Sequence, residues 1–196
     1  MLLLASTSPT RKQLLKQAGL AFAVQAPDVD ERALEAAAGA IKPEALARHL
    51  AEAKALAVSE SFADALVIGA DQVLALDGAL LHKTGSIEAA RDRLDQLRAR
   101  THHLHAAAAL ARNGQVLWST LDSAELEMRA FTAAERDRVL ELEGEGVLRS
   151  VGGYRLEGPS IQLFSRVAGD YFTILGLPLL PLLAGIRAFT AEGENP

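Results

Sequence analysis

The 196-residue chain contains no cysteine, which excludes disulfide bonds, thiolate catalysis and Cys-ligated zinc. No apolar run approaches the roughly 20 residues that a membrane-spanning helix needs. The first apolar run covers residues 2–5 without a basic lead-in, which is not the pattern of a signal peptide. Basic residues are in the minority and the net charge is −5, which argues against non-specific binding to nucleic acid or to anionic membranes. These absences predict a cytoplasmic protein without a membrane or nucleic-acid partner.

The order of expected strands and helices is typical of a mixed α/β sheet flanked by helices. Hairpin turns are expected at Asp77-Gly78 and Asn113-Gly114. The apolar patterns predict strands at 2–5, 22–26, 66–75, 101–111 and 116–128, a short return arm from residue 80, and short strands at Phe164 and 171–175. They predict helices at 9–18, 43–59, 87–99, 132–141 and 179–189.

A polar segment follows the first strand, where an α/β sheet places its ligands. Ser8 is a suitable N-cap and Pro9 suits the first helical position, with Arg11 and Lys12 in the first turn. The free N–H groups of a helix N-terminus attract phosphate, and the two cations add to that attraction. The alternative is an ordinary capped helix with two surface cations.

A carboxylate follows the apolar strand that begins at Leu66. Asp71 at this position can take a proton from water or ligate a divalent cation, or it can simply cap a turn. A regular hairpin through Asp77-Gly78 places Lys83 opposite Gln72, close to the carboxylate. This ammonium either clamps a substrate phosphate or is a solvated hairpin lysine.

Two further charged residues are candidates for the same site. Lys54 lies at the border of the apolar face of the 43–59 helix, so it reaches inward or lies along the surface. Glu31 ends an acidic loop at 27–31 and supplies a metal oxygen ligand or only solvates the loop. His103 and His105 share a strand face, but a metal site there needs at least one more ligand.

Together these segments resemble the Maf family of nucleoside triphosphate pyrophosphatases. The matching segments are Leu4-Ala5-Ser6-Thr7-Ser8-Pro9 with Arg11, Asp28-Val29-Asp30-Glu31, Glu52-Ala53-Lys54-Ala55, Ile68-Gly69-Ala70-Asp71-Gln72-Val73 with Lys83, Gly153-Tyr154 with Glu157-Gly158, and Gly169-Asp170-Tyr171 with Gly176-Leu177-Pro178-Leu179. The resemblance implies one domain over 1–196, with two lobes around a central cleft, and it implies a possible homodimer.

The resemblance also implies Mg²⁺- or Mn²⁺-dependent hydrolysis of a nucleoside triphosphate to the monophosphate and pyrophosphate. By analogy Asp71 accepts the proton of the attacking water, and Glu31 joins Asp71 at the metal. The implied triphosphate contacts are Ser8, Arg11, Lys12, Lys54 and Lys83. Two alternatives remain at this stage. One is a non-catalytic nucleotide-binding regulator of septum formation and cell division, and the other is a nucleotidyltransferase.

Two positions bear on the substrate. Gln72 and Glu157 match the subgroup that acts on 7-methyl-GTP, whereas the subgroup acting on dTTP and UTP has Thr and Gln there. A carboxylate can accept from the guanine N1–H and amino group together, and its charge favours a cationic methylated purine. The alternative is that Glu157 is a solvated loop acid. Departures from the family pattern include Lys12 for a second Arg, His82 and Thr84 beside Lys83, and Arg149-Ser150-Val151-Gly152 for Asp-Lys-Ala-Gly.

Overall fold

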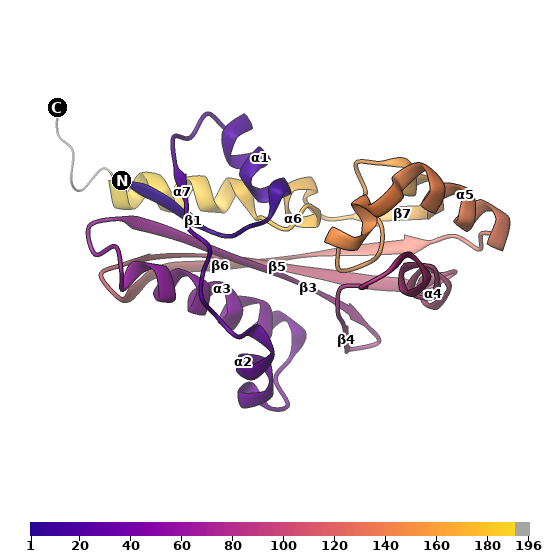
Figure 1. Cartoon of the computed structure of the whole chain (residues 1–196), viewed down its shortest axis with the longest axis horizontal. Coiled ribbons are helices and arrows are strands. Elements are labelled where there is room, and N and C mark those ends of the chain that lie inside the picture. Colours follow the sequence, from indigo (N-terminus) through magenta and orange to yellow (C-terminus); the bar gives the residue numbers. More distant parts are fainter. Residues whose placement is uncertain (191–196) are drawn as a thin grey trace.

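The computed structural model describes residues 1–190 and confirms the mixed α/β sheet flanked by helices (Figure 1). The strands are β1 (Leu2–Ala5), β2 (Ala23–Val24), β3 (Leu66–Leu76), β4 (Ala79–Leu81), β5 (Thr101–Arg112), β6 (Gln115–Met128) and β7 (Phe164–Ala168). The α-helices are α1 (Pro9–Gln17), α2 (Glu31–Ala38), α3 (Pro43–Ser59), α4 (Ile87–Leu97), α5 (Ala133–Glu143), α6 (Tyr171–Ile174) and α7 (Leu179–Thr190). Two 3₁₀ helices are η1 (Gly144–Arg149) and η2 (Pro159–Leu163). Among the described helices, none is long and apolar enough to cross a membrane.

One helix was not predicted and another was predicted as a strand, and in both cases an aspartate caps the helix. The expected acidic loop leads at once into α2, because the Asp30 side chain accepts a hydrogen bond from the Ala33 N–H at 3.0 Å. The expected strand at 171–175 is the short helix α6, where Asp170 accepts from the Thr173 N–H at 3.0 Å. Helix α5 begins as predicted, and Thr132 forms a capping box with Glu135 there.

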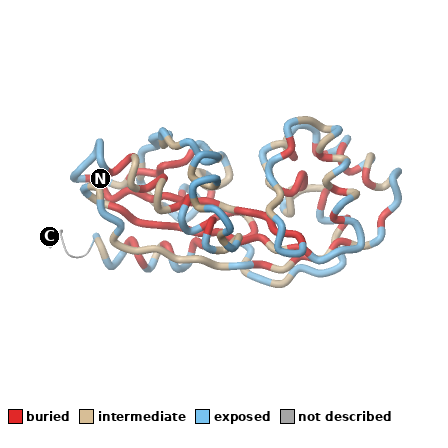
Figure 2. Tube along the Cα trace, turned by 90° about the horizontal axis from the view of Figure 1, so that it is seen from below, coloured by how far each residue is buried: buried red, intermediate tan, exposed pale blue. Residues whose placement is uncertain are grey.

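The helices cover the sheet in two groups, one at each end of its long strands (Figures 1 and 2). At one end, α1 and α7 pack on one face through Leu15 and Leu182, and α3 packs on the other through Leu50. At the other end, α4 and α5 cover a separate apolar cluster that includes Leu94 and Leu140. The prediction that residues 1–196 form one domain extends beyond the described residues and stays a prediction.

The edge of β3 that faces β1 has a gap in its pairing. Residues Leu66–Gly69 pair with β1, and Leu74–Leu76 pair with β4, while β5 occupies the opposite edge from Val67 to Ala75. Residues 70–73 therefore present an open edge between two partner strands. The Asp77-Gly78 turn and its register are as predicted, but pairing ends at Leu81. The expectation that Lys83 pairs opposite Gln72 is therefore wrong, because Lys83 lies beyond the strand.

Helix α3 approaches β3 very closely at Gly69. A Cβ atom at this position would lie 2.1 Å from the Ala51 carbonyl oxygen and 2.7 Å from the Ala55 backbone N. The backbones of α3 and β3 can therefore be this close only because the residue is glycine. Two residues further along β3 is Asp71, so this contact also sets how far α3 lies from the carboxylate.

We expect Gly69→Ala to lower the free energy of unfolding by about 3 kcal/mol, because a methyl group cannot fit without moving α3 away from the sheet. Urea unfolding followed by circular dichroism measures the change. Gly85→Ala is the matched control, since a Cβ at Gly85 meets nothing within 4 Å. Equal unfolding midpoints for the two variants would contradict the close contact.

A histidine is buried in the apolar cluster under α4 and α5. His102 has no exposed surface, and its Nε2 lies 2.7 Å from the Tyr154 hydroxyl. Its ring also makes edge contacts with Tyr154 and lies against Phe164. Burial, helped by the charge of His103, lowers the pKa of His102 to about 4. The folded state therefore keeps this imidazole neutral at pH values where the unfolded chain protonates it.

The unfolded chain takes up a proton below the ordinary pKa of 6.5, while folded His102 does so only near pH 4. Stability is therefore full above pH 6.5 and falls with decreasing pH down to about 4. We expect the wild type to lose about 1.4 kcal/mol more per pH unit in this range than His102→Gln. Urea midpoints at several pH values measure the slopes, and parallel slopes would contradict a neutral buried His102.

Candidate active site

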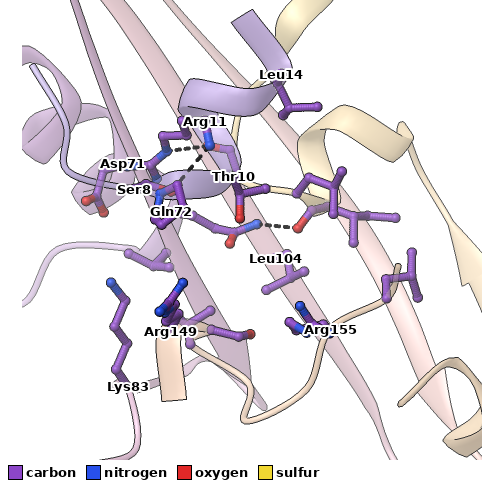
Figure 3. Close-up of a pocket in the computed structure, with 18 of the residues that line it drawn as sticks. Ser8, Thr10, Arg11, Leu14, Asp71, Gln72, Lys83, Leu104, Arg149 and Arg155 are labelled. Atoms are coloured by element: carbon purple, nitrogen blue, oxygen red, sulfur yellow. Dashed lines mark hydrogen bonds between the residues drawn. The ribbon is translucent and has the colours of Figure 1, made fainter. Parts of the chain in front are cut away.

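A cavity of about 680 Å³ opens beside the gap in the β3 edge. This volume is within the usual range for small-ligand sites, about 300–1,000 Å³. Its walls come from α1, α2, α3, β3 and the loop after β4, and from the segments around 149–157 and 171–176. It thus lies between the two groups of helices, and Figure 3 shows side chains entering it from opposite sides.

Asp71, Lys54 and Glu31 form a charged chain on the α3 side of the cavity. Alternation along β3 points Asp71 toward α3, where Lys54 lies on the buried face of the helix. The Lys54 Nζ is 2.5 Å from Asp71 Oδ1 and 2.8 Å from Glu31 Oε1. Lys54 thus reaches inward, and both it and Asp71 are 6% exposed. The structure brings these three predicted site residues into direct contact.

The surroundings of Asp71 affect its protonation in opposing ways. Burial raises the pKa of the Asp71 carboxyl, while the positive charges of Lys54 and Arg11 oppose the rise. The hydrogen bond from Lys54 also favours the ionised form, and the charge of Glu31 favours the protonated form. The net effect is a raised pKa, which makes this carboxylate a stronger base than a solvated aspartate.

Arg11 is held mainly by protein oxygen atoms. Its Nε donates to the Gly176 carbonyl at 2.8 Å, and its Nη1 donates to the Ala70 carbonyl at 2.9 Å and to Ser6 Oγ at 3.4 Å. Burial lowers the pKa of Arg11, and Asp71 opposes this. The guanidinium joins α1 to the open edge of β3 and to the turn after α6. It therefore fixes the wall beside Asp71, and contact with a phosphate stays a prediction.

The remaining predicted residues of α1 differ in position. Ser8 lines the cavity and caps α1, with its Oγ accepting from the Arg11 N–H at 3.4 Å. Lys12 is absent from the cavity lining among residues 1–190. Successive helical residues are rotated by about 100°, so a neighbour of Arg11 points elsewhere. The structure thus separates Lys12 from the other candidate phosphate contacts.

Gln72 faces the opposite side of the sheet from Asp71 and holds α6. Its Nε2 donates to the carbonyls of Thr173 at 3.0 Å and Ile174 at 2.9 Å, as the dashed line in Figure 3 illustrates. Both amide hydrogens are therefore used by the protein, which fixes the orientation of the amide. The Oε1 atom of Gln72 is the part of the amide that can still accept a hydrogen bond from a ligand.

The wall opposite Ser8 and Gln72 carries Lys83, Arg149 and Arg155 (Figure 3). Glu157 is exposed and lines the same cavity. Arg155 Nε donates at 2.7 Å to Oε2 of Glu143, whose side chain is fully buried. Most of the predicted site residues, from Ser8 to Glu157, therefore meet around one cavity.

Sequence analysis missed Glu143 and Arg93, two residues that fix this wall. Glu143 also accepts hydrogen bonds from the backbone N–H of Ser160 at 2.9 Å and from its hydroxyl at 2.7 Å. Arg93 Nη1 donates to the carbonyls of His82 at 3.0 Å and Val151 at 2.8 Å. Both act across long sequence separations onto backbone or loop atoms, and no local motif marks such contacts.

Side chains suited to a metal are few. No group of three or more His, Cys, Asp or Glu side chains in residues 1–190 could hold a metal ion. The rings of His103 and His105 stack 6.0 Å apart without a third ligand. Glu31 and Asp71 are two carboxylates beside the cavity, and Mg²⁺ is commonly held by one or two carboxylates together with substrate phosphates. The residues present fit that kind of site and do not form an all-protein cage.

Known proteins resemble this chain over nearly its whole length. The family model described as Maf-like protein matches residues 1–189. A 7-methyl-GTP pyrophosphatase of Brucella abortus biovar 1 (strain 9-941) is 49% identical over 189 residues, which cover 95% of this chain and 94% of that protein. A protein of the same name from Rhizobium meliloti (strain 1021) is 48% identical over 194 residues, or 97% of each chain. A nucleoside triphosphate pyrophosphatase of Caulobacter vibrioides (strain ATCC 19089 / CIP 103742 / CB 15) is 49% identical over 186 residues, 94% of this chain and 93% of that protein.

The family match covers every residue that lines the cavity, from Ser8 to Gly176. The resemblance inferred from the separate sequence motifs is therefore confirmed, and the chain belongs to the Maf family.

Proposed function

We propose that this protein hydrolyses a nucleoside triphosphate to the monophosphate and pyrophosphate. The observation that carries the proposal is Asp71, a buried carboxylate with a raised pKa that faces a cavity lined by cations. The names of the relatives support the same reaction class, since they are pyrophosphatases. They do not favour a non-catalytic regulator of septum formation.

In this reaction the oxygen of a water molecule bonds to the α-phosphorus, and the bond from that phosphorus to the bridging oxygen breaks. Pyrophosphate leaves with the electron pair, and Asp71 accepts the proton of the water. Lys54 orients Asp71 through the contact at 2.5 Å. Lys83 on the opposite wall stabilises negative charge on the leaving group. The cavity walls fix these groups before the substrate enters.

We propose that Glu31 and Asp71 hold Mg²⁺ or Mn²⁺ together with the substrate phosphates. Lys54 contacts both carboxylates, so the side chains of Glu31 and Asp71 converge on the same ammonium group. The ion would neutralise phosphate charge when bound. When no metal ion is bound, the positive charge of Lys54 offsets the repulsion between the two carboxylates.

The residues facing the cavity favour a purine nucleotide with a positive charge on its base, such as 7-methyl-GTP. Glu157 can accept two hydrogen bonds from the guanine edge, and its charge attracts a methylated, cationic ring. Gln72 offers an acceptor in a fixed orientation. The Brucella and Rhizobium relatives carry the name of this activity. The homodimer and the cytoplasmic location stay predictions of the sequence analysis.

The test of the function is pyrophosphate release across a panel of nucleotides. The panel contains 7-methyl-GTP, GTP, ATP, CTP, UTP and dTTP, each with Mg²⁺, with Mn²⁺ and with a chelator. We expect release that depends on the metal and is fastest with 7-methyl-GTP. Tight nucleotide binding without release would support the regulator, and a nucleotidylated acceptor would support a transferase.

We expect Asp71→Asn to lower kcat roughly 1,000-fold, because the amide cannot accept the proton. Folding is expected to persist, since Lys54 keeps its partner Glu31 at 2.8 Å. Asp92→Asn is the control, since Asp92 is exposed and is not part of the cavity lining in the described chain. Steady-state kinetics with thermal unfolding measure both properties. An Asp71→Asn enzyme with wild-type turnover would exclude Asp71 as the base.

We expect Glu157→Gln to lower kcat/KM for 7-methyl-GTP roughly 10- to 100-fold, because it removes a charged acceptor for the base. The effect on UTP is expected to be small, since uracil lacks both the amino group and the positive charge. Glu145→Gln removes a nearby exposed carboxylate that does not line the cavity in the described chain. Equal losses with both substrates would show that Glu157 supports the loop instead of reading the base.

A further inference from the structure

We propose that Arg149 binds the pyrophosphate half of the substrate, alongside Lys83. The inference rests on the proposed hydrolysis of a nucleoside triphosphate and adds a specific contact to it. It gives a substrate-binding role to a residue that the sequence analysis noted only as a departure from the family pattern.

The Arg149 guanidinium is available to a ligand. Arg149 is the last residue of η1, and its side chain is exposed and lines the cavity. Figure 3 shows it entering the cavity beside Lys83. Within residues 1–190 its side chain forms neither an ion pair nor a hydrogen bond, so no protein acceptor occupies its five N–H donors.

Three other cations of the cavity are already engaged, and a fourth, Arg32, belongs to α2 next to Glu31. Lys54 lies between two carboxylates, and Arg11 donates to backbone carbonyls. Arg155 is paired with the buried carboxylate of Glu143. A nucleoside triphosphate brings several negative charges into the cavity, and these must be met by cations. On the wall opposite Asp71, Lys83 and Arg149 are the cations that form no ion pair with a carboxylate within residues 1–190, whereas Arg155 does.

The backbone segments that carry these two cations are joined by one residue of α4. Arg93 Nη1 donates to the His82 carbonyl, next to Lys83, and to the Val151 carbonyl, two residues after Arg149. A second hydrogen bond holds the backbone next to Arg149, since the Ser150 N–H donates to the Val147 carbonyl at 3.1 Å. The two side chains therefore extend from backbone segments that are tied to the same guanidinium.

The direction of the reaction places the leaving group on this wall. In an in-line displacement at phosphorus, the leaving group departs on the side opposite the attacking water. Asp71 must lie near that water to take its proton, and Lys83 and Arg149 lie across the cavity from Asp71 (Figure 3). Pyrophosphate therefore leaves toward them, where a planar guanidinium can bind two of its oxygens at once.

The test compares Arg149→Gln, Arg149→Lys and the control Arg48→Gln, which removes an exposed arginine that is not part of the described cavity lining. We expect Arg149→Gln to raise KM for the triphosphate, and Kd for inorganic pyrophosphate by calorimetry, roughly tenfold. Inhibition by the nucleoside monophosphate is expected to stay within about twofold, because that product lacks the pyrophosphate half. Arg149→Lys is expected to restore part of the affinity, since it keeps the charge and loses the planar fork.

Equal KM and pyrophosphate Kd for Arg149→Gln and Arg48→Gln would overturn the proposal. Equal weakening of monophosphate and pyrophosphate would also overturn it, because that result indicates a displaced loop. A wild-type protein that releases no pyrophosphate from any nucleotide would overturn the proposed function. In that case the calorimetric comparison with pyrophosphate alone still decides whether Arg149 binds this anion.

Discussion

The contact between Lys54 and Asp71 is the interaction on which the site depends. Asp71 is only 6% exposed, so its carboxylate carries a large desolvation cost, which the ammonium at 2.5 Å offsets. Gly69 makes the contact possible, because a side chain there would hold α3 away from β3. Loss of either partner would leave the other charge buried with less compensation. The protonation of Asp71 therefore depends on the position of Lys54.

The polar side chains on the two sides of the cavity differ in whether they have partners within the protein. Around Asp71, the polar groups bind one another: Arg11 donates to carbonyls, Gln72 holds α6, and Lys54 joins two acids. Across the cavity, Lys83 and Arg149 extend without protein partners within residues 1–190. A preorganised base thus faces a wall that attracts anions, which is the arrangement that anhydride hydrolysis requires.

Much of this arrangement follows from local sequence signals. Ser8 before Pro9 predicts where α1 begins, and Asp77-Gly78 predicts the turn after β3, because each signal acts over a few residues. The short helix α6 was predicted as a strand, because apolar spacing over four residues does not separate the two and the Asp170 cap decides. Glu143 and Arg93 act over long sequence separations, so the folded chain is needed to find them.

The open edge of β3 explains how neighbouring residues on opposite faces of a sheet can serve one ligand. Asp71 points toward α3 and Gln72 toward α6, as the alternation of a strand requires. In a fully paired sheet the two side chains would be separated by the sheet itself. Here the pairing of β3 with β1 ends at Gly69, and its pairing with β4 begins only at Leu74. The cavity therefore extends around the exposed edge of β3 and reaches both side chains. A substrate that contacts both residues must therefore lie across that edge, and a nucleotide can do so with its phosphates and its base as two chemically distinct ends.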